Sequence, residues 1–358
     1  MAGKRLTLRW VHVWAILTCI ATAFLLTLGG LVTTFRVGMA DPVWPTEPWF
    51  LLVTSWSEPR PGFLIEHAHR LAGFTVGGMM AVLAIGIWWT EPRSSVRRAG
   101  TLGLIVLLAS FGQFHRAMMA QANTIEIVWP FGAIGVMVVS LIMVAGCAAS
   151  GILAGHRGSG SRALGVIALV AVMIQGLLGG FRVRLNAWAG TDLAAVHGIF
   201  AQVVFSMLVG LAVLTTAPRE TYKVHEYRGR LPLVLTALVF VQLIWGVLVR
   251  HHPSALVQRF HLMFAFAVVA TAVPLIGSRR GFGVCLLAVF LVLQVMLGVE
   301  AWMGKFASGV LPELQRVSKG QAIVRTGHVL IGTGILATSV ALVLASRRQP
   351  GSAQPGDA

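Results

Sequence analysis

Apolar runs of roughly 20 residues recur along the chain, and short stretches between them hold most of its charged residues. Each run is long enough to cross about 30 Å of hydrocarbon. A spanning segment must satisfy its own backbone hydrogen bonds, so the runs predict helices; the alternation typical of a membrane barrel is absent. The ten predicted helices cover residues 12–34, 64–89, 100–119, 128–153, 163–182, 192–215, 231–250, 257–277, 283–303 and 323–345.

Composition and charge support an all-α polytopic membrane protein. Hydrophobic residues make up 56% of the chain and the mean hydropathy is +0.81, well above an ordinary soluble domain. The net charge of +16 does not indicate a nucleic-acid partner, because the basic residues lie in short loops between spans. With both termini in the cytoplasm, sixteen of the 28 Lys and Arg residues fall on the inner side. The partner that composition predicts is the lipid bilayer.

The start of the chain also resembles a signal peptide, but its apolar core is long and lacks a clean cleavage site, which favours an uncleaved first span. Cys19, Cys147 and Cys285 all fall within predicted spans, so no disulfide in an outer loop is expected. We expect the polar tail at residues 349–358 to be disordered.

Four of the eleven histidines share one position in the pattern. Each lies a few residues into a helix that starts from the outer face, which predicts a similar depth for all of them. They are His69, His197, His261 and His328, in "IEHAHRLAG", "LAAVHGIFAQ", "VQRFHLMFAF" and "VRTGHVLIGTG".

Ionisable groups inside a span are costly and usually mark a site. A single histidine of this kind can equally cap or pack against a neighbouring helix, but four at one depth favour a common role. Imidazole is a good iron ligand, and axial ligands in helical bundles come from facing helices. Zinc fits less well, because three of the four histidines have no accompanying Cys or carboxylate. The pattern therefore suggests two hemes, each with two histidine ligands.

The helix before each histidine helix tends to end in small residues followed by an arginine. Glycines let a helix approach a neighbour or a flat macrocycle closely. The arginines suit heme propionates, although snorkelling at the interface would explain each one alone. The recurrence indicates an internal repeat of two helix pairs per half. The candidate propionate partners are Arg36, Arg182, Arg184, Arg250 and Arg325.

These stretches together resemble the heme A synthases, which oxidise a methyl group of heme O to the formyl group of heme A. The resemblance covers residues 10–90 and 162–345. The matching stretches are "GGLVTTFRVGMADPVWP", "EHAHR", "QGLLGGFRVRLNAWAGTDLAAVHGIFAQ", "GVLVRHHP" to "FHLMFAF", and "LQVMLGVEAWMG" to "RTGHVLIGTG".

The resemblance implies eight core helices in two similar four-helix bundles. It implies that His69 and His197 handle the substrate or product heme, heme O or heme A, with Arg70 and Arg182 beside them. His261 and His328 would be the axial ligands of a resident heme b that relays electrons. Heme O would come from a farnesyl-transferring heme O synthase, and cytochrome oxidase assembly factors or an electron acceptor would be further partners. The implied location is the bacterial cytoplasmic (inner) membrane.

Glu66 matches the functional carboxylate of the family. It lies three residues before His69, so the two are expected on one helix face, and no other histidine of the four has such a carboxylate. Oxidation of a C–H bond releases protons, so an acceptor beside the heme is needed. The alternative is that Glu66 only pairs with Arg70, four residues on. We interpret His67 as an interfacial residue or a proton relay.

The chain departs from the family pattern in two ways. Residues 35–63 contain no cysteine, whereas some members carry a cysteine pair there. An extra transmembrane hairpin is inserted, and His115, Arg116 and Glu126 at its outer end are expected to be an ordinary polar tip. The predicted divisions are 1–97 for the first helix pair, 98–160 for the inserted hairpin, 161–218 for the second pair, 219–348 for the C-terminal heme b half and 349–358 for the tail.

Three other functions stay open. A diheme electron-transfer cytochrome would need the histidines but not Glu66. A transporter would fit the repeated halves, and an assembly factor for cytochrome oxidase would need no chemistry. The small-residue-rich helices permit a homo-oligomer without requiring one.

Overall fold

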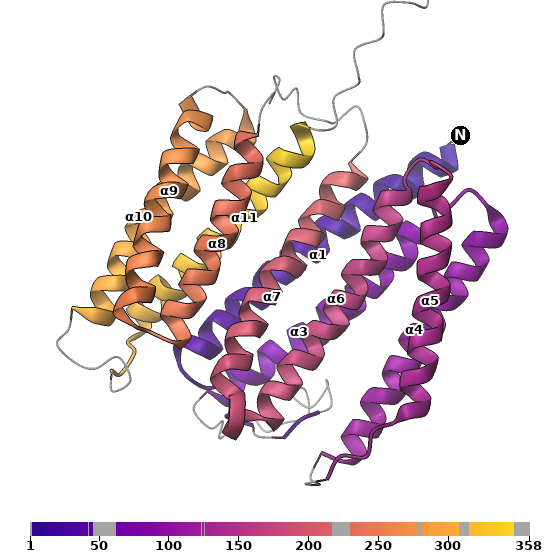
Figure 1. Ribbon diagram of the computed structural model, residues 1–358, viewed down its shortest axis with the longest axis horizontal. Helices are drawn as coiled ribbons and strands as arrows, with labels where there is room; N and C mark the ends of the chain where they lie inside the picture. The colour runs from indigo at the N-terminus through magenta and orange to yellow at the C-terminus, as the bar shows by residue number, and fades with distance from the viewer. Residues whose placement is uncertain are drawn as a thin grey trace, which may run out of the picture. The chain divides into compact units, whose positions relative to one another are not determined.

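A computed structural model describes residues 2–41, 43–45, 62–122, 124, 126–216, 230–277, 281–307 and 315–346, with side chains from residue 9 onward. Within these residues the chain forms helices and connecting turns, with no strand (Figure 1). The helices are α1 (Ala2–Thr34), α3 (Phe63–Trp88), α4 (Ser94–Ala120), α5 (Phe131–Leu153), α6 (Ser159–Arg184), α7 (Asn186–Thr215), α8 (Leu231–His251), α9 (Ala255–Gly277), α10 (Phe282–Phe306) and α11 (Lys319–Ser346).

All ten predicted spans are confirmed as helices that are long and apolar enough to cross a membrane. Most begin or end a few residues beyond the predicted bounds, because polar residues at the interface continue the helix past its apolar run. Helix α7 starts six residues earlier than predicted, and its first turn is separated from the rest by the non-helical Ala189 (φ −145°, ψ 21°). The predicted disordered tail lies outside the described residues.

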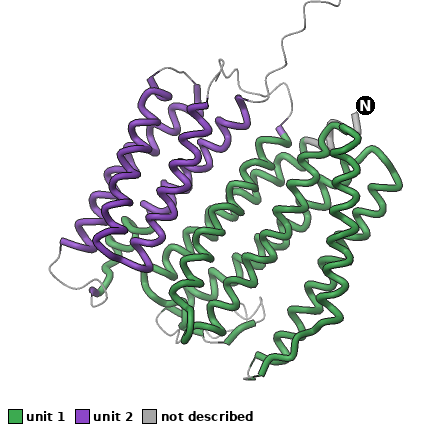
Figure 2. Tube along the Cα trace, viewed as in Figure 1, with its two compact units in different colours: residues 1–215, 316–326 green, residues 216–315, 327–358 purple. Residues whose placement is uncertain are grey.

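The described part of the chain forms two compact units (Figure 2). Unit 1 comprises residues 1–215 and 316–326, and unit 2 comprises residues 216–315 and 327–358. In unit 1, helices α1, α3, α6 and α7 pack as a bundle in which α1 contacts α3 and α7, and α6 contacts α3 and α7. Its centre is filled by fully buried side chains such as Met80, Leu83, Leu169 and Leu208.

The inserted segment forms an antiparallel hairpin of α4 and α5 within unit 1. Helix α4 also contacts α3, and α5 also contacts α6, so the hairpin lies beside the bundle (Figure 1). The hairpin is tightly joined to α3 near the start of α4, where the ring of Trp88 lies so close to Gly100 that no side chain would fit there. Leu104 and Val144 of the hairpin belong to the same buried core as the bundle.

Unit 2 has its own core, built from α8, α9, α10 and the C-terminal part of α11. Leu235, Leu287 and Leu336 are fully buried there. Glycines allow close approach of α11: Gly332 lies against Leu243 and Gln294, and Gly334 lies against Phe290.

Large apolar side chains cover the outer surface of the helices in both units. Phe131 is 75% exposed, Val139 68% and Phe266 68%. A water-soluble protein rarely exposes so much continuous apolar surface. The protein is therefore an integral, multi-pass membrane protein, and these surfaces are suited to lipid. Cys19, Cys147 and Cys285 are free thiols, as expected.

Candidate functional site

The four predicted histidines each pack against a glycine on the preceding helix. A Cβ atom added at this glycine would lie 2.9 to 3.2 Å from the imidazole Cε1. Such a distance is shorter than the preferred carbon–carbon contact of about 3.5–4.0 Å, so a larger residue at this position would displace the ring. The pairs are Gly29 with His69, Gly179 with His197, Gly246 with His261 and Gly298 with His328.

A second feature repeats one helical turn before each glycine. Each imidazole lies near the backbone of the residue four positions before its glycine. These residues are Leu25, Gln175, Gln242 and Gln294. The same helix–helix register is therefore used four times, twice in each unit. The sequence analysis did not single out the three glutamines, although the repeated spacing Gln-x-x-x-Gly was present as a signal.

Two of these glutamines also reach the other side of the imidazole ring. The side-chain amide nitrogen of Gln175 lies 3.3 Å from Nε2 of His197, and that of Gln294 lies 3.4 Å from Nε2 of His328. These are the second histidines of their units. In each case the glutamine amide contacts the ring nitrogen that would ligate a metal. The glutamine side chain would therefore have to move away when the histidine binds a metal.

His261 and His328 face one another in unit 2. Their ring centroids are 6.3 Å apart, and the ring planes are inclined by 81°. An imidazole nitrogen lies about 2 Å from a metal that it ligates, so two rings on opposite sides of one ion have centroids roughly 6 Å apart. The pair thus has the separation that axial ligands of one iron need, and each ring packs against a glycine. Among the described residues no three His, Cys, Asp or Glu side chains gather as a metal site.

His69 and His197 form the corresponding pair in unit 1, close enough to interact electrostatically. The positive charge of Arg182 acts on both rings. The guanidinium of Arg182 packs against the backbone of Gly38 so closely that no side chain would fit there, and its buried Nε has no hydrogen-bond acceptor. Arg182 is therefore the predicted propionate partner whose placement, beside the histidine pair, best suits an anionic group.

Glu66 is almost fully buried, and both of its carboxylate oxygens accept hydrogen bonds. Oε1 accepts from Nη2 of Arg70 at 2.7 Å, and Oε2 accepts from the backbone N–H of Asp41 at 2.8 Å. The pairing with Arg70 that the sequence left open as the alternative is thus present. Arg182 also lies within electrostatic range of Glu66. These contacts attach the segment that follows α1 to the start of α3.

Asp41 is a site residue that the sequence analysis missed. Its carboxylate lies 3.2 Å from Nη1 of Arg70 and 3.3 Å from Nε2 of His67, and its backbone carbonyl accepts a hydrogen bond from Arg70 at 2.6 Å. His67 is buried and packs against the ring of Phe63. No short motif reveals this partner, because it comes from the loop after the preceding helix.

The remaining candidate arginines differ in their surroundings. Arg184 donates through Nη2 to the backbone carbonyl of Gln121 at 2.5 Å, so it holds the C-terminal end of α4. Arg36 follows the end of α1 in the left-handed conformation (φ 57°) and lies within electrostatic range of Arg325. Arg250 acts electrostatically on His328. Of the candidate propionate partners, Arg182 and Arg250 are therefore the two whose charge acts on a histidine of their own unit.

The polar residues at the tip of the inserted hairpin are placed as follows. His115 packs edge-on against Phe74 of α3, with ring centroids 5.5 Å apart, and is therefore a contact between the hairpin and the bundle. Arg116 is exposed to the surroundings. The backbone carbonyl of Glu126 accepts a hydrogen bond from the Thr124 hydroxyl within the turn.

Comparisons with protein-family models, with curated proteins and with solved structures gave no match to this chain. The chemistry of the site therefore has to be argued from its residues. Paired imidazoles at this separation can ligate one metal ion, and the buried cations beside one pair can bind an anionic group.

Proposed function

We propose that the protein is a heme A synthase of the bacterial cytoplasmic membrane. The observation that carries the proposal is the glycine–histidine register, which occurs four times and brings His261 and His328 to the separation of axial ligands. His261 and His328 would hold heme b, which supplies one-electron transfer when bound. His69 and His197 would hold heme O or heme A. Arg182 and Arg250 would bind propionates, since the guanidinium fork suits carboxylates.

Glu66 has a conditional role in this proposal. Oxidation of a methyl group to a formyl group releases protons, and Glu66 is the carboxylate on the helix of His69. Its two oxygens accept hydrogen bonds from Arg70 and from the backbone N–H of Asp41. While both donors are in place, Glu66 positions Arg70 and the loop around Asp41.

The occupied carboxylate also favours a second candidate, a diheme electron-transfer cytochrome without chemistry on heme. Such a protein would use Glu66 only as a structural attachment. Both functions require the four histidines and the lipid bilayer, but only the synthase depends on heme O from a farnesyl-transferring heme O synthase. An electron acceptor or cytochrome oxidase assembly factors would be partners of the synthase.

The two functions are separated by expressing the protein in a host that makes heme O and extracting the pigments. We expect heme A to appear, and we expect His261→Ala to abolish both heme A and the heme b spectrum. Glu66→Ala should abolish heme A while the heme b spectrum stays intact. If heme O alone persists beside a normal bis-histidine spectrum in the unmodified protein, the synthase proposal is wrong and the electron carrier stands.

A further inference from the structure

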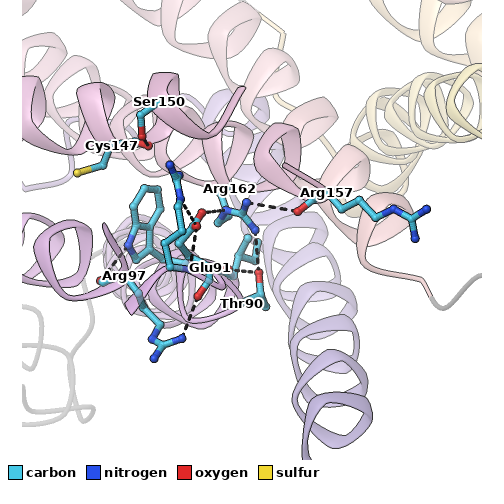
Figure 3. A network of polar contacts seen from close by, with 10 residues as sticks. Thr90, Glu91, Arg97, Cys147, Ser150, Arg157 and Arg162 are labelled. Atoms are coloured by element: carbon cyan, nitrogen blue, oxygen red, sulfur yellow. Dashed lines mark hydrogen bonds and ion pairs between the residues drawn. The ribbon is translucent and has the colours of Figure 1, made fainter. Parts of the chain in front are cut away.

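A cluster of basic residues surrounds one buried carboxylate at the inner end of the inserted hairpin. The α3–α4 junction and the α5–α6 junction meet there, over residues 89–100 and 154–162 (Figure 3). These two segments contain five arginines and a single acidic residue, Glu91, which leaves an excess of four positive charges. The arginines are Arg93, Arg97, Arg98, Arg157 and Arg162. The proposed function gives this cluster no role.

Glu91 uses its carboxylate entirely on two of the arginines. Oε1 lies 2.7 Å from Nε of Arg93, and Oε2 lies 3.0 Å from Nε of Arg162, which is almost fully buried. Burial raises the pKa of Glu91, but hydrogen bonds from the side chain and backbone of Arg93 and the charge of Arg162 outweigh it and hold the pKa below its usual range. The ionised carboxylate therefore fixes the geometry of the cluster without neutralising it.

The guanidinium groups of Arg98 and Arg157 are accessible to an external anion. Arg97 is held by a hydrogen bond of 2.9 Å to the backbone carbonyl of Glu91, while Arg98 and Arg157 are exposed. Figure 3 shows the Arg157 side chain extending away from Glu91. Nη2 of Arg93 is buried and has no hydrogen-bond acceptor, which is costly for a charged donor.

Apolar surface adjoins the cluster on its membrane side. Trp89 is 61% exposed, Ile152 51% and Leu153 88%. One turn beyond Arg98, on the same face of α4, Leu102 lines a groove of about 520 Å³ between α4 and α5, together with Val106 and Met143. A ligand that fits both surfaces has an anionic head group and an apolar chain.

We infer that this cluster binds the phosphate group of an anionic phospholipid, with an acyl chain along the α4–α5 groove. Basic residues at the cytoplasmic end of spanning helices attract anionic head groups, and arginine suits phosphate. The ligand holds the inner end of the hairpin in the lipid, independently of any heme. The inner position follows from the distribution of basic residues between the two sides of the chain.

The experiment titrates chain-labelled phosphatidylglycerol into the full-length protein in neutral detergent, with chain-labelled phosphatidylcholine as the head-group control. We expect tighter binding of phosphatidylglycerol. Arg98→Gln should weaken it about fivefold, and Arg98→Gln with Arg157→Gln about 25-fold, since each such arginine contributes about that factor. Arg116→Gln is the matched control, because Arg116 is also exposed on α4 but at its outer end. Arg98→Lys should restore most of the binding.

Two results would overturn the inference. Equal affinity for the two lipids, or an equal loss in Arg98→Gln and Arg116→Gln, would show that the cluster does not recognise the head group. Displacement of the labelled lipid by inorganic phosphate at equal concentration would assign the cluster to free phosphate. The readout contains no heme, so its failure leaves the proposed enzyme untouched, and failure of the enzyme leaves this binding intact.

Discussion

The glycine–histidine register can be tested with two alanine substitutions in one helix. Gly179 and Gly176 both lie in α6, three residues apart. A Cβ at position 179 would lie 3.2 Å from Cε1 of His197, whereas a Cβ at position 176 would meet no atom within 4 Å. The two variants therefore add the same methyl group to the same helix, once against the imidazole and once in open space.

The expected magnitudes follow from two opposing effects. Alanine stabilises a helix interior by about 0.5–1 kcal/mol relative to glycine. A methyl group inserted into a tight contact costs about 1–3 kcal/mol. The helix preference is common to both variants and cancels in their difference. We therefore expect Gly176→Ala to raise the free energy of unfolding by about 0.5–1 kcal/mol. The free energy of unfolding of Gly179→Ala should be about 1–3 kcal/mol lower than that of Gly176→Ala.

The assay is denaturant unfolding of both variants in the same detergent, followed by tryptophan fluorescence, together with the amount of heme that each variant retains. Gly179→Ala should also retain less heme, because the ring of His197 is displaced by a few tenths of an ångström. Equal unfolding free energies and equal heme retention in the two variants would refute the close packing of His197 on Gly179. Gly298→Ala, with a contact of 2.9 Å to His328, should disturb the heme b spectrum in the same way.

Three further predictions concern the inserted hairpin and its buried charges. Glu91→Gln leaves the buried Arg162 without an ionised partner and should destabilise the protein by about 3–5 kcal/mol in thermal or denaturant unfolding; an unchanged stability would contradict the network. The pKa of Glu91 is held below its usual range. The stability that the ionised carboxylate contributes is therefore fully present above the pKa of an unfolded glutamate, about 4.3, and is lost as the pH falls through the lower pKa of the folded protein. Unfolding midpoints measured from pH 7 down to pH 3 should thus fall more steeply for the unmodified protein than for Glu91→Gln. Arg184→Gln removes the donor to the carbonyl of Gln121 and should increase hydrogen exchange at the outer end of α4, whereas Arg116→Gln should not.

Much of the fold could be predicted from the sequence because the bilayer requires a long apolar run for every span. All ten helices were found this way, as were the exposed apolar surfaces. The four histidine helices were also recognised, because a polar residue in a span is conspicuous. The prediction was weakest at helix ends, such as the start of α7 before Ala189, where no apolar pattern marks the boundary.

The sequence by itself determined the spans and the residue types that lie opposite one another: a histidine in one helix and glycines in the helix before it. Which glycine each imidazole contacts was decided only by the tertiary structure, since it depends on the register between two helices. The same holds for Glu66 with Asp41 and for Glu91 with Arg162, whose partners come from other segments. Periodicity along one helix is a local property, whereas a buried ion pair forms between whichever charged groups the packing of separate helices brings into contact.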